Sequence, residues 1–150
     1  MRPKSIGRVW LNSPDPLAAP AIDPNFFGDE RDIETMVAGF KMTRRLLETP
    51  TLRRLQKKDL FTEGVESDDD IRTVLRARVD TVYHPVGTCK MGVNDSLAVV
   101  DPNLRVHGVE GLRVVDASIM PTLIGGNTNA PTIMIGEKAA DMIKADMRAS

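Results

Sequence analysis

The sequence predicts a mixed fold, in which α-helices and short β-strands occupy different parts of the chain. Three observations support this. Apolar residues recur at helical spacing over residues 31–48 and 67–82. The same spacing returns near Pro131 and continues to about Met147. Between the second and third of these segments lies a stretch rich in glycine and proline, with two short apolar runs typical of strands.

The composition argues against several classes of protein. A chain of 150 residues fits one domain with a real core. Its 20 basic and 21 acidic residues balance, whereas a nucleic-acid or polybasic membrane surface needs clustered positive charge. The single Cys89 cannot form an internal disulfide, and no apolar run approaches the roughly 18 residues of a transmembrane segment. We therefore expect a cytoplasmic protein that binds no nucleic acid; peripheral membrane association stays open.

The N-terminal segment predicts a strand followed by an extended connection. Residues 6–11, IGRVWL, alternate weakly, as in a short strand. Four prolines follow at positions 14, 16, 20 and 24, and they exclude a helix there. The connection is too apolar for a disordered linker, so we expect it to lie against the surface of a larger body.

The first helix is expected over residues 31–48, with Asp29 as its N-cap and Asp32 in its first turn. Its apolar face carries Ile33, Met36, Val37, Phe40, Arg44 and Leu47. Pro50 ends it, and the basic residues 51–61 predict about two further helical turns. Their charges could suggest phosphate binding, but acidic residues flank them, which favours an ordinary solvated face.

The second helix begins at Ser67, followed by three aspartates that place negative charge in its first turn. Three adjacent carboxylates could suggest a metal site. Consecutive residues on a helix point in different directions, however, so a capping role is the better interpretation. The apolar stripe continues to Val82, and Pro85 pushes His84 out of helical geometry into a loop that contains Gly87.

Residues 82–136 contain the candidate site. Two apolar runs, 104–106 and 112–115, are separated by HGVEG and predict a hairpin or tight turn. The segment LRVVDAS, 112–118, predicts a buried strand with Asp116 at its carboxyl end, where ligands of open α/β sheets collect. The Gly125–Gly126 pair then allows close approach of a ligand to the backbone. The third helix follows, and its positive N-terminus could stabilise a negative charge on that ligand.

His84 is the strongest single candidate for catalysis. As a neutral imidazole at a helix exit, it could accept a proton from a hydroxyl near neutral pH. Cys89 could suggest a thiol nucleophile paired with this histidine, but so short a spacing within one loop argues against that pair. Two histidines and one cysteine with no ligand spacing give no support for a zinc site.

Several blocks of sequence together resemble a known family. They are HPVGTCKMG at 84–92, VVDPNLRVHGVEGLRVVDASIMP at 99–121 and GNTNAPTIMIGEKAADMI at 126–143, with RPKSIG at 2–7 and IDPNFF at 22–27. In this order they resemble the C-terminal portion of the glucose–methanol–choline (GMC) flavin-dependent oxidoreductases, in particular the alcohol and choline dehydrogenases. The resemblance extends over nearly the whole chain.

The resemblance implies a role for each site residue. His84 matches the family's active-site histidine, and Asn127 matches a second catalytic position that is Asn or His in the family. Asp116 and Ala117 match FAD contacts, and Asn127, Thr128 and Asn129 match the segment beside the flavin's pyrimidine edge. The implied reaction oxidises a primary alcohol, choline or another, to an aldehyde by hydride transfer to flavin N5. The helix after Asn129 would stabilise the anionic reduced flavin; no metal is implied.

The resemblance also implies an α+β fold in two parts. Residues 1–96 would belong to a substrate domain, an antiparallel sheet covered by helices. Residues 97–150 would return to an FAD-binding α/β domain as a strand and a closing helix. Family members hold the FAD pyrophosphate with an N-terminal G-x-G-x-x-G, which is absent from these 150 residues. We therefore expect an incomplete FAD domain, and a fragment or split subunit that is inactive by itself.

A second hypothesis comes from another functional class. The chain could be a non-catalytic remnant, or a module that binds a partner through its N-terminal helices, with His84 vestigial. The intact blocks around His84 and Asn127 favour an origin as an enzyme. Neither the alcohol nor the final electron acceptor (oxygen, a quinone or a dye) follows from the sequence.

Overall fold

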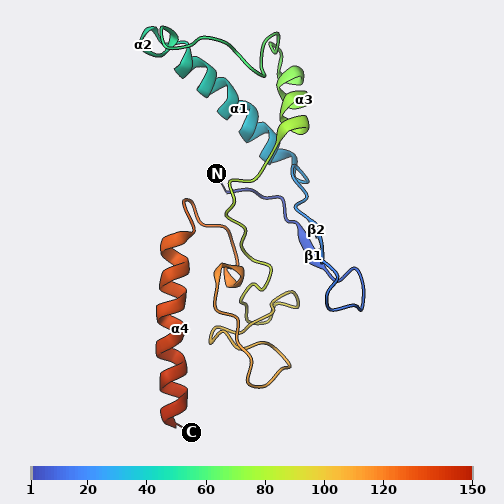
Figure 1. Ribbon diagram of the computed structural model, residues 1–150, viewed down its shortest axis with the longest axis vertical. Helices are drawn as coiled ribbons and strands as arrows, with labels where there is room; N and C mark the ends of the chain where they lie inside the picture. Colours follow the sequence, from blue (N-terminus) through green and yellow to red (C-terminus); the bar gives the residue numbers. More distant parts are fainter. Residues whose placement is uncertain (1, 150) are drawn as a thin grey trace. The chain divides into compact units, whose positions relative to one another are not determined.

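The computed structural model describes residues 2–149, which form two compact units (Figure 1). The N-terminal unit is Pro3–Asp80, and the C-terminal unit comprises Arg2 and the residues from Thr81 onward. These units are defined by contacts within the chain. The division at residue 96 concerns the domains of a complete enzyme, and it stays a prediction.

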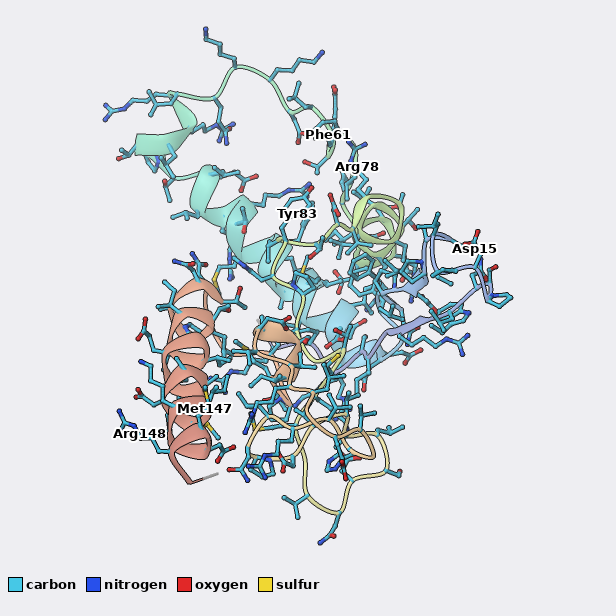
Figure 2. The ribbon with its side chains drawn as sticks, turned by 60° about the horizontal axis from the view of Figure 1, so that its bottom comes forward. Asp15, Phe61, Arg78, Tyr83, Met147 and Arg148 are labelled. Carbon is cyan, nitrogen blue, oxygen red and sulfur yellow. The ribbon has the colours of Figure 1, made fainter. Side chains whose placement is uncertain are left out.

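The N-terminal unit is built on two packed helices. Helix α1, Glu30–Leu47, lies against α3, Asp68–Arg78 (Figure 1). Their buried contacts are Val37, Val65 and Ile71, with Phe40, Val74 and Leu75 packed around them. The helical spacing in the sequence thus identified both helices and most of their buried faces; Leu47, expected on the apolar face of α1, is 43% exposed. In Figure 2 the labelled Arg78 lies beside Phe61, with its guanidinium carbon 3.8 Å from the ring centroid.

The expected caps of α1 and α3 are confirmed. The Asp29 side chain accepts a hydrogen bond from Arg31 N, and the Arg31 side chain holds the pKa of Asp29 at about 2. Ser67 and Asp70 form a reciprocal capping box at α3. The three aspartates have separate partners: Asp68 pairs with Lys41, Asp69 with Arg72, and Asp70 with Ser67. This is the divergence expected of adjacent helical residues.

Asp32 does more than place charge in the first turn of α1. Its carboxylate accepts hydrogen bonds from Lys4 N at 2.8 Å, from Ser5 N at 2.7 Å and from the Ser5 hydroxyl. Partial burial raises its pKa, but these hydrogen bonds lower it by more, so the net shift is downward. The carboxylate therefore fixes residues 4 and 5 to the start of the helix.

Three expectations for this unit need correction. Residues 6–11 do contain strand β1, Arg8–Trp10, but it pairs with an unpredicted β2, Ala21–Asp23, inside the proline-rich connection. Helix α2 is one turn, Pro50–Arg53, because Asp59 accepts from the amides of Phe61 and Thr62 and so forms a turn where more helix was expected. Helix α3 ends at Arg78, before Val82, since Val79 is already extended.

The C-terminal unit consists of loops packed on one long helix, α4, Asn129–Ala149. The buried core joins Val100, Leu104, Ile119, Met120, Ile135 and Ala139. Backbone hydrogen bonds connect the loops: Met91 N donates to Ile119 O at 2.8 Å and Val99 N to Lys90 O at 2.9 Å. Asp146 on α4 binds both Arg105 and Arg113, and these contacts lower its pKa.

The buried strand expected at 112–118 is not formed. This segment has one bridge, Arg105 with Arg113, and it continues into a 3₁₀ turn, Ala117–Ile119. Leu112 is 50% and Val115 37% exposed. A strand needs a neighbouring strand to pair with its backbone N–H and C=O groups, and the described residues supply a single bridge here. The tight turn itself is present: Val106 N donates to Leu112 O, and Gly108 and Gly111 adopt positive φ.

The predicted antiparallel sheet is correspondingly small. Within residues 2–149 the only sheet is the β1–β2 pair, so the described part of the chain is a small α/β piece. No helix in this range is both long and apolar enough to cross a membrane.

We expect Gly7→Ala to separate β1 from β2. A Cβ on Gly7 would lie 2.3 Å from the Asp23 carbonyl oxygen, and a backbone atom cannot rotate away. Overpacking of this kind costs about 1–3 kcal/mol, so amide hydrogen exchange across β1 and β2 should accelerate about tenfold or more. Gly39→Ala in α1 is the matched control, because a Cβ there meets nothing within 4 Å. Unchanged exchange in Gly7→Ala would contradict this account.

Candidate active site

The backbone around His84 is held in an unusual conformation. Tyr83 has a φ of 61°, in the left-handed region that bulky residues seldom adopt, and its N–H donates to the Thr81 hydroxyl. Pro85 restricts His84 to extended geometry from the other side. The half-buried imidazole is thereby directed by its chain neighbours.

One ring nitrogen of His84 has a specific partner. His84 Nδ1 lies 2.9 Å from the Thr128 hydroxyl, a contact that spans 44 residues of sequence. Thr128 directly precedes α4, and its carbonyl accepts from Thr132 N at 3.0 Å and from Thr132 Oγ1 at 2.7 Å. The histidine is thus bound to the first turn of the long helix.

His84 and Asn127, the two predicted catalytic residues, line the same concavity. Its volume is ≈ 200 Å³, and its other lining residues are Val82, Leu123, Ile124, Gly125 and Gly126. The lining side chains are apolar except for the imidazole and the amide, which can exchange or share a proton with a hydroxyl. The apolar lining residues were not predicted, because no local pattern marks them.

The glycine pair leaves room at this site. Neither Gly125 nor Gly126 has a positive φ, so backbone strain does not require them. A Cβ on Gly126 would meet nothing within 4 Å, and one on Gly125 would touch the Arg2 guanidinium at 3.0 Å. Open space beside Gly126, next to the start of α4, is where a flat ligand could approach the backbone.

Most of the predicted cofactor contacts lie outside this concavity. Asp116 and Ala117 do not line the concavity; the Asp116 carboxylate accepts from Ser118 N at 2.7 Å, and Ala117 packs on the core. Asn129 is the exposed first residue of α4, and Thr128 is buried against His84. Of the five proposed contacts, Asn127 alone lines the concavity with His84.

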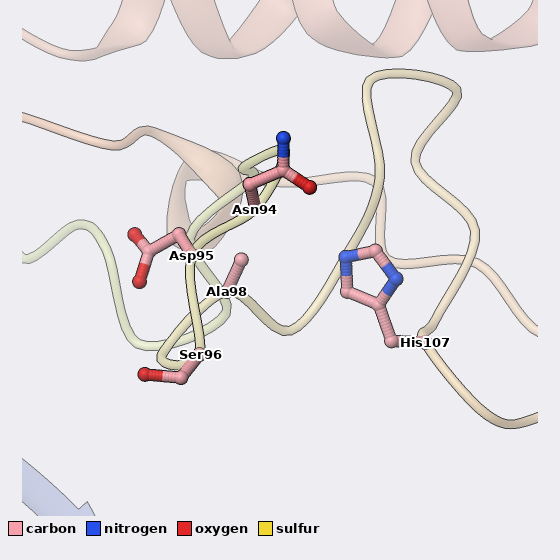
Figure 3. Close-up of a pocket in the computed structure, with 5 residues that line it drawn as sticks. All are labelled: Asn94, Asp95, Ser96, Ala98 and His107. Atoms are coloured by element: carbon pink, nitrogen blue, oxygen red, sulfur yellow. The ribbon is translucent and has the colours of Figure 1, made fainter.

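A larger concavity, ≈ 380 Å³, lies elsewhere and holds none of the predicted residues. It is lined by Asn94, Asp95, Ser96, Ala98 and His107 (Figure 3). Figure 3 shows the Asp95 carboxylate pointing away from His107. That carboxylate is bound by Lys90 and by Leu97 N, which lower its pKa. The one carboxylate in this lining is therefore not directed at His107, and the smaller concavity is the better candidate.

Comparison with known proteins identifies the family. The C-terminal family model described as GMC oxidoreductase matches residues 3–136. The chain belongs to the GMC oxidoreductase family. Within this family it is 51% identical over 148 residues to an alcohol dehydrogenase [acceptor] of Pseudomonas putida, covering 97% of the chain and 27% of that protein. It is 49% identical over 146 residues to human mitochondrial choline dehydrogenase, covering 96% and 25%.

The fold agrees with solved GMC-type structures. An FAD-dependent oxidoreductase from Chaetomium thermophilum superimposes with a TM-score of 0.90 at 31% identity, over 99% of this chain and 26% of that one. The chain thus spans about a quarter of the length of its GMC relatives.

The variant Gly87→Ala tests whether the loop after His84 requires the left-handed backbone conformation of Gly87. Gly87 has a φ of 85°, and a Cβ there would lie 3.3 Å from Met120 O. Left-handed geometry costs a non-glycine residue about 1–2 kcal/mol, and denaturant unfolding should show a loss of this size. Gly126→Ala, with neither strain nor contact, should change stability by no more than about 0.5 kcal/mol. Equal stability of the two variants would show that the Gly87 conformation is unimportant.

Proposed function

We propose that this chain carries the substrate-side catalytic residues of an FAD-dependent enzyme that oxidises a primary alcohol, choline among the candidates, to an aldehyde. The observation that carries the proposal is that His84 and Asn127 line one concavity beside the start of α4. The names of the alcohol and choline dehydrogenases in the family support the same class of substrate.

The site fits FAD in two physical respects. The open space beside Gly126 can admit a planar ring, which a side chain at that position would fill. The first turn of α4 presents amides without intrahelical acceptors and a partial positive charge, which suit a ring system that becomes anionic on reduction. Asp116, Ala117, Asn127, Thr128 and Asn129 would contact the cofactor. Asp116 and Thr128 would do so through their main chain, because their side chains already have partners.

His84 and Asn127 divide the work on the substrate hydroxyl. His84 Nε2 takes the hydroxyl proton, since Nδ1 is occupied by Thr128. The Asn127 amide donates a hydrogen bond to the same oxygen and holds the carbinol carbon in place. When bound, FAD would supply the two-electron oxidising power for that carbon. Val82, Leu123 and Ile124 present apolar side chains in the same lining.

His84→Ala in a complete enzyme that contains this region is the direct test. Loss of a general base lowers turnover by about 10²–10⁴-fold while the flavin content stays unchanged. His107→Ala removes the other histidine, in the other concavity, and should leave turnover unaffected. Full turnover by the His84 variant would remove this residue from the mechanism and favour the non-catalytic alternative.

We also expect these 150 residues alone to bind no stoichiometric FAD. They contain no G-x-G-x-x-G loop, which supplies much of the affinity for a dinucleotide through its contacts to the pyrophosphate. Size-exclusion chromatography of the chain mixed with FAD, monitored by visible flavin absorbance, measures this. Co-elution of one flavin per chain would show that the phosphate loop is dispensable.

A further inference from the structure

We propose that Thr128 is a positioning residue, whose hydroxyl accepts a hydrogen bond from Nδ1–H of His84 and so leaves Nε2 as the proton acceptor in the concavity. The proposal deepens the function above and rests on it for the role of Nε2. The distance between Thr128 Oγ1 and His84 Nδ1 is 2.9 Å, within normal hydrogen-bond range.

Thr128 is buried in a way that requires a partner for its hydroxyl. It is 8% exposed, and it is the one polar or charged residue among those described that is buried. A hydroxyl removed from water without a hydrogen bond costs about 1–3 kcal/mol. The His84 ring supplies that bond, so histidine and threonine stabilise each other's position.

The sequence explains why this threonine does not simply cap its helix. Thr128 directly precedes α4, and a threonine there normally accepts from the second or third amide of the helix. The third helical residue is Pro131, which has no N–H. One of the two amides that usually donate to such a hydroxyl is therefore missing, and the hydroxyl lies against His84 Nδ1.

The backbone of Thr128 is fixed independently of its hydroxyl. Its carbonyl accepts from both the amide and the hydroxyl of Thr132, which anchors it to the first turn of α4. A partner held this firmly restrains the rotation of the imidazole.

The two possible proton arrangements have different consequences. If Nδ1–H donates to the threonine, Nε2 keeps its lone pair and can take a substrate proton; the Nδ1–H bond then persists unchanged in the imidazolium. If the threonine donated to Nδ1, Nε2 would already carry the proton of the neutral ring. The geometry fits both arrangements, and the first is the one that supports a base at Nε2.

Nuclear magnetic resonance of the chain labelled with ¹⁵N-histidine tests the proposal without any cofactor. Long-range ¹H–¹⁵N correlation spectra distinguish the two neutral tautomers, and His107 provides an internal reference in each spectrum. We expect His84 to be mainly Nδ1–H in the wild type and in Thr128→Ser, which keeps the hydroxyl. In Thr128→Val, which keeps the shape alone, His84 should shift toward the Nε2–H form preferred by a free histidine side chain.

Several outcomes would overturn the proposal. If His84 in the wild-type chain is mainly Nε2–H, the proposal is wrong. This test needs no variant, so it holds even if Thr128→Val fails to fold. The proposal is also wrong if His84 loses the Nδ1–H form in a folded Thr128→Ser variant. Unchanged His107 signals would show that this variant is folded. A folded Thr128→Val with an unchanged His84 tautomer also contradicts it.

Kinetics of a complete enzyme containing this region give a second readout. Thr128→Val should lower kcat about tenfold, the value of one hydrogen bond, with little change in KM, and Thr128→Ser should restore the rate. Equal losses in both variants would indicate a merely structural effect. If the tautomer behaves as expected but His84→Ala retains full turnover, the positioning role stands and the proposed function fails.

Discussion

The packing of α4 against the loops of the C-terminal unit is the interaction on which the site depends. Ile135 and Ala139 on the helix enter the same buried cluster as Val100, Leu104 and Ile119 from the loops. Asp146, farther along the helix, adds ion pairs to Arg105 and Arg113. These contacts fix the helix along its length, and the position of its first turn follows.

That first turn lies beside the candidate site. Thr128 contacts His84, Asn127 lines the concavity with it, and the helix start brings partial positive charge to the same place. His84 itself belongs to a loop with no regular structure, restrained by Tyr83 in a left-handed conformation and by Pro85. A loop residue thus gains a defined orientation from a helix more than 40 residues away.

The N-terminal unit is stabilised by a different principle, in which short polar side chains satisfy the ends of helices. Asp29, Asp32 and the Ser67–Asp70 pair each bind backbone amides, and all three carboxylates have lowered pKa values. Such groups favour the folded state above the ordinary carboxylate pKa, and they lose this effect as the pH falls below it. Charge in this unit serves helix capping and ion pairing with arginine and lysine.

The sequence by itself determined the three long helices and the caps of α1 and α3, and it singled out His84 and Asn127, which line one concavity. Apolar spacing and N-cap residues act over one or two turns, so α1, α3 and α4 could be read locally. The tertiary structure alone decided that β2 forms, that 112–118 makes a single bridge instead of a strand, and that Thr128 binds His84. Each of these depends on a partner distant in sequence. A strand exists only with a neighbour, and a buried hydroxyl bonds to whichever group the packing brings within 3 Å, which no local pattern encodes.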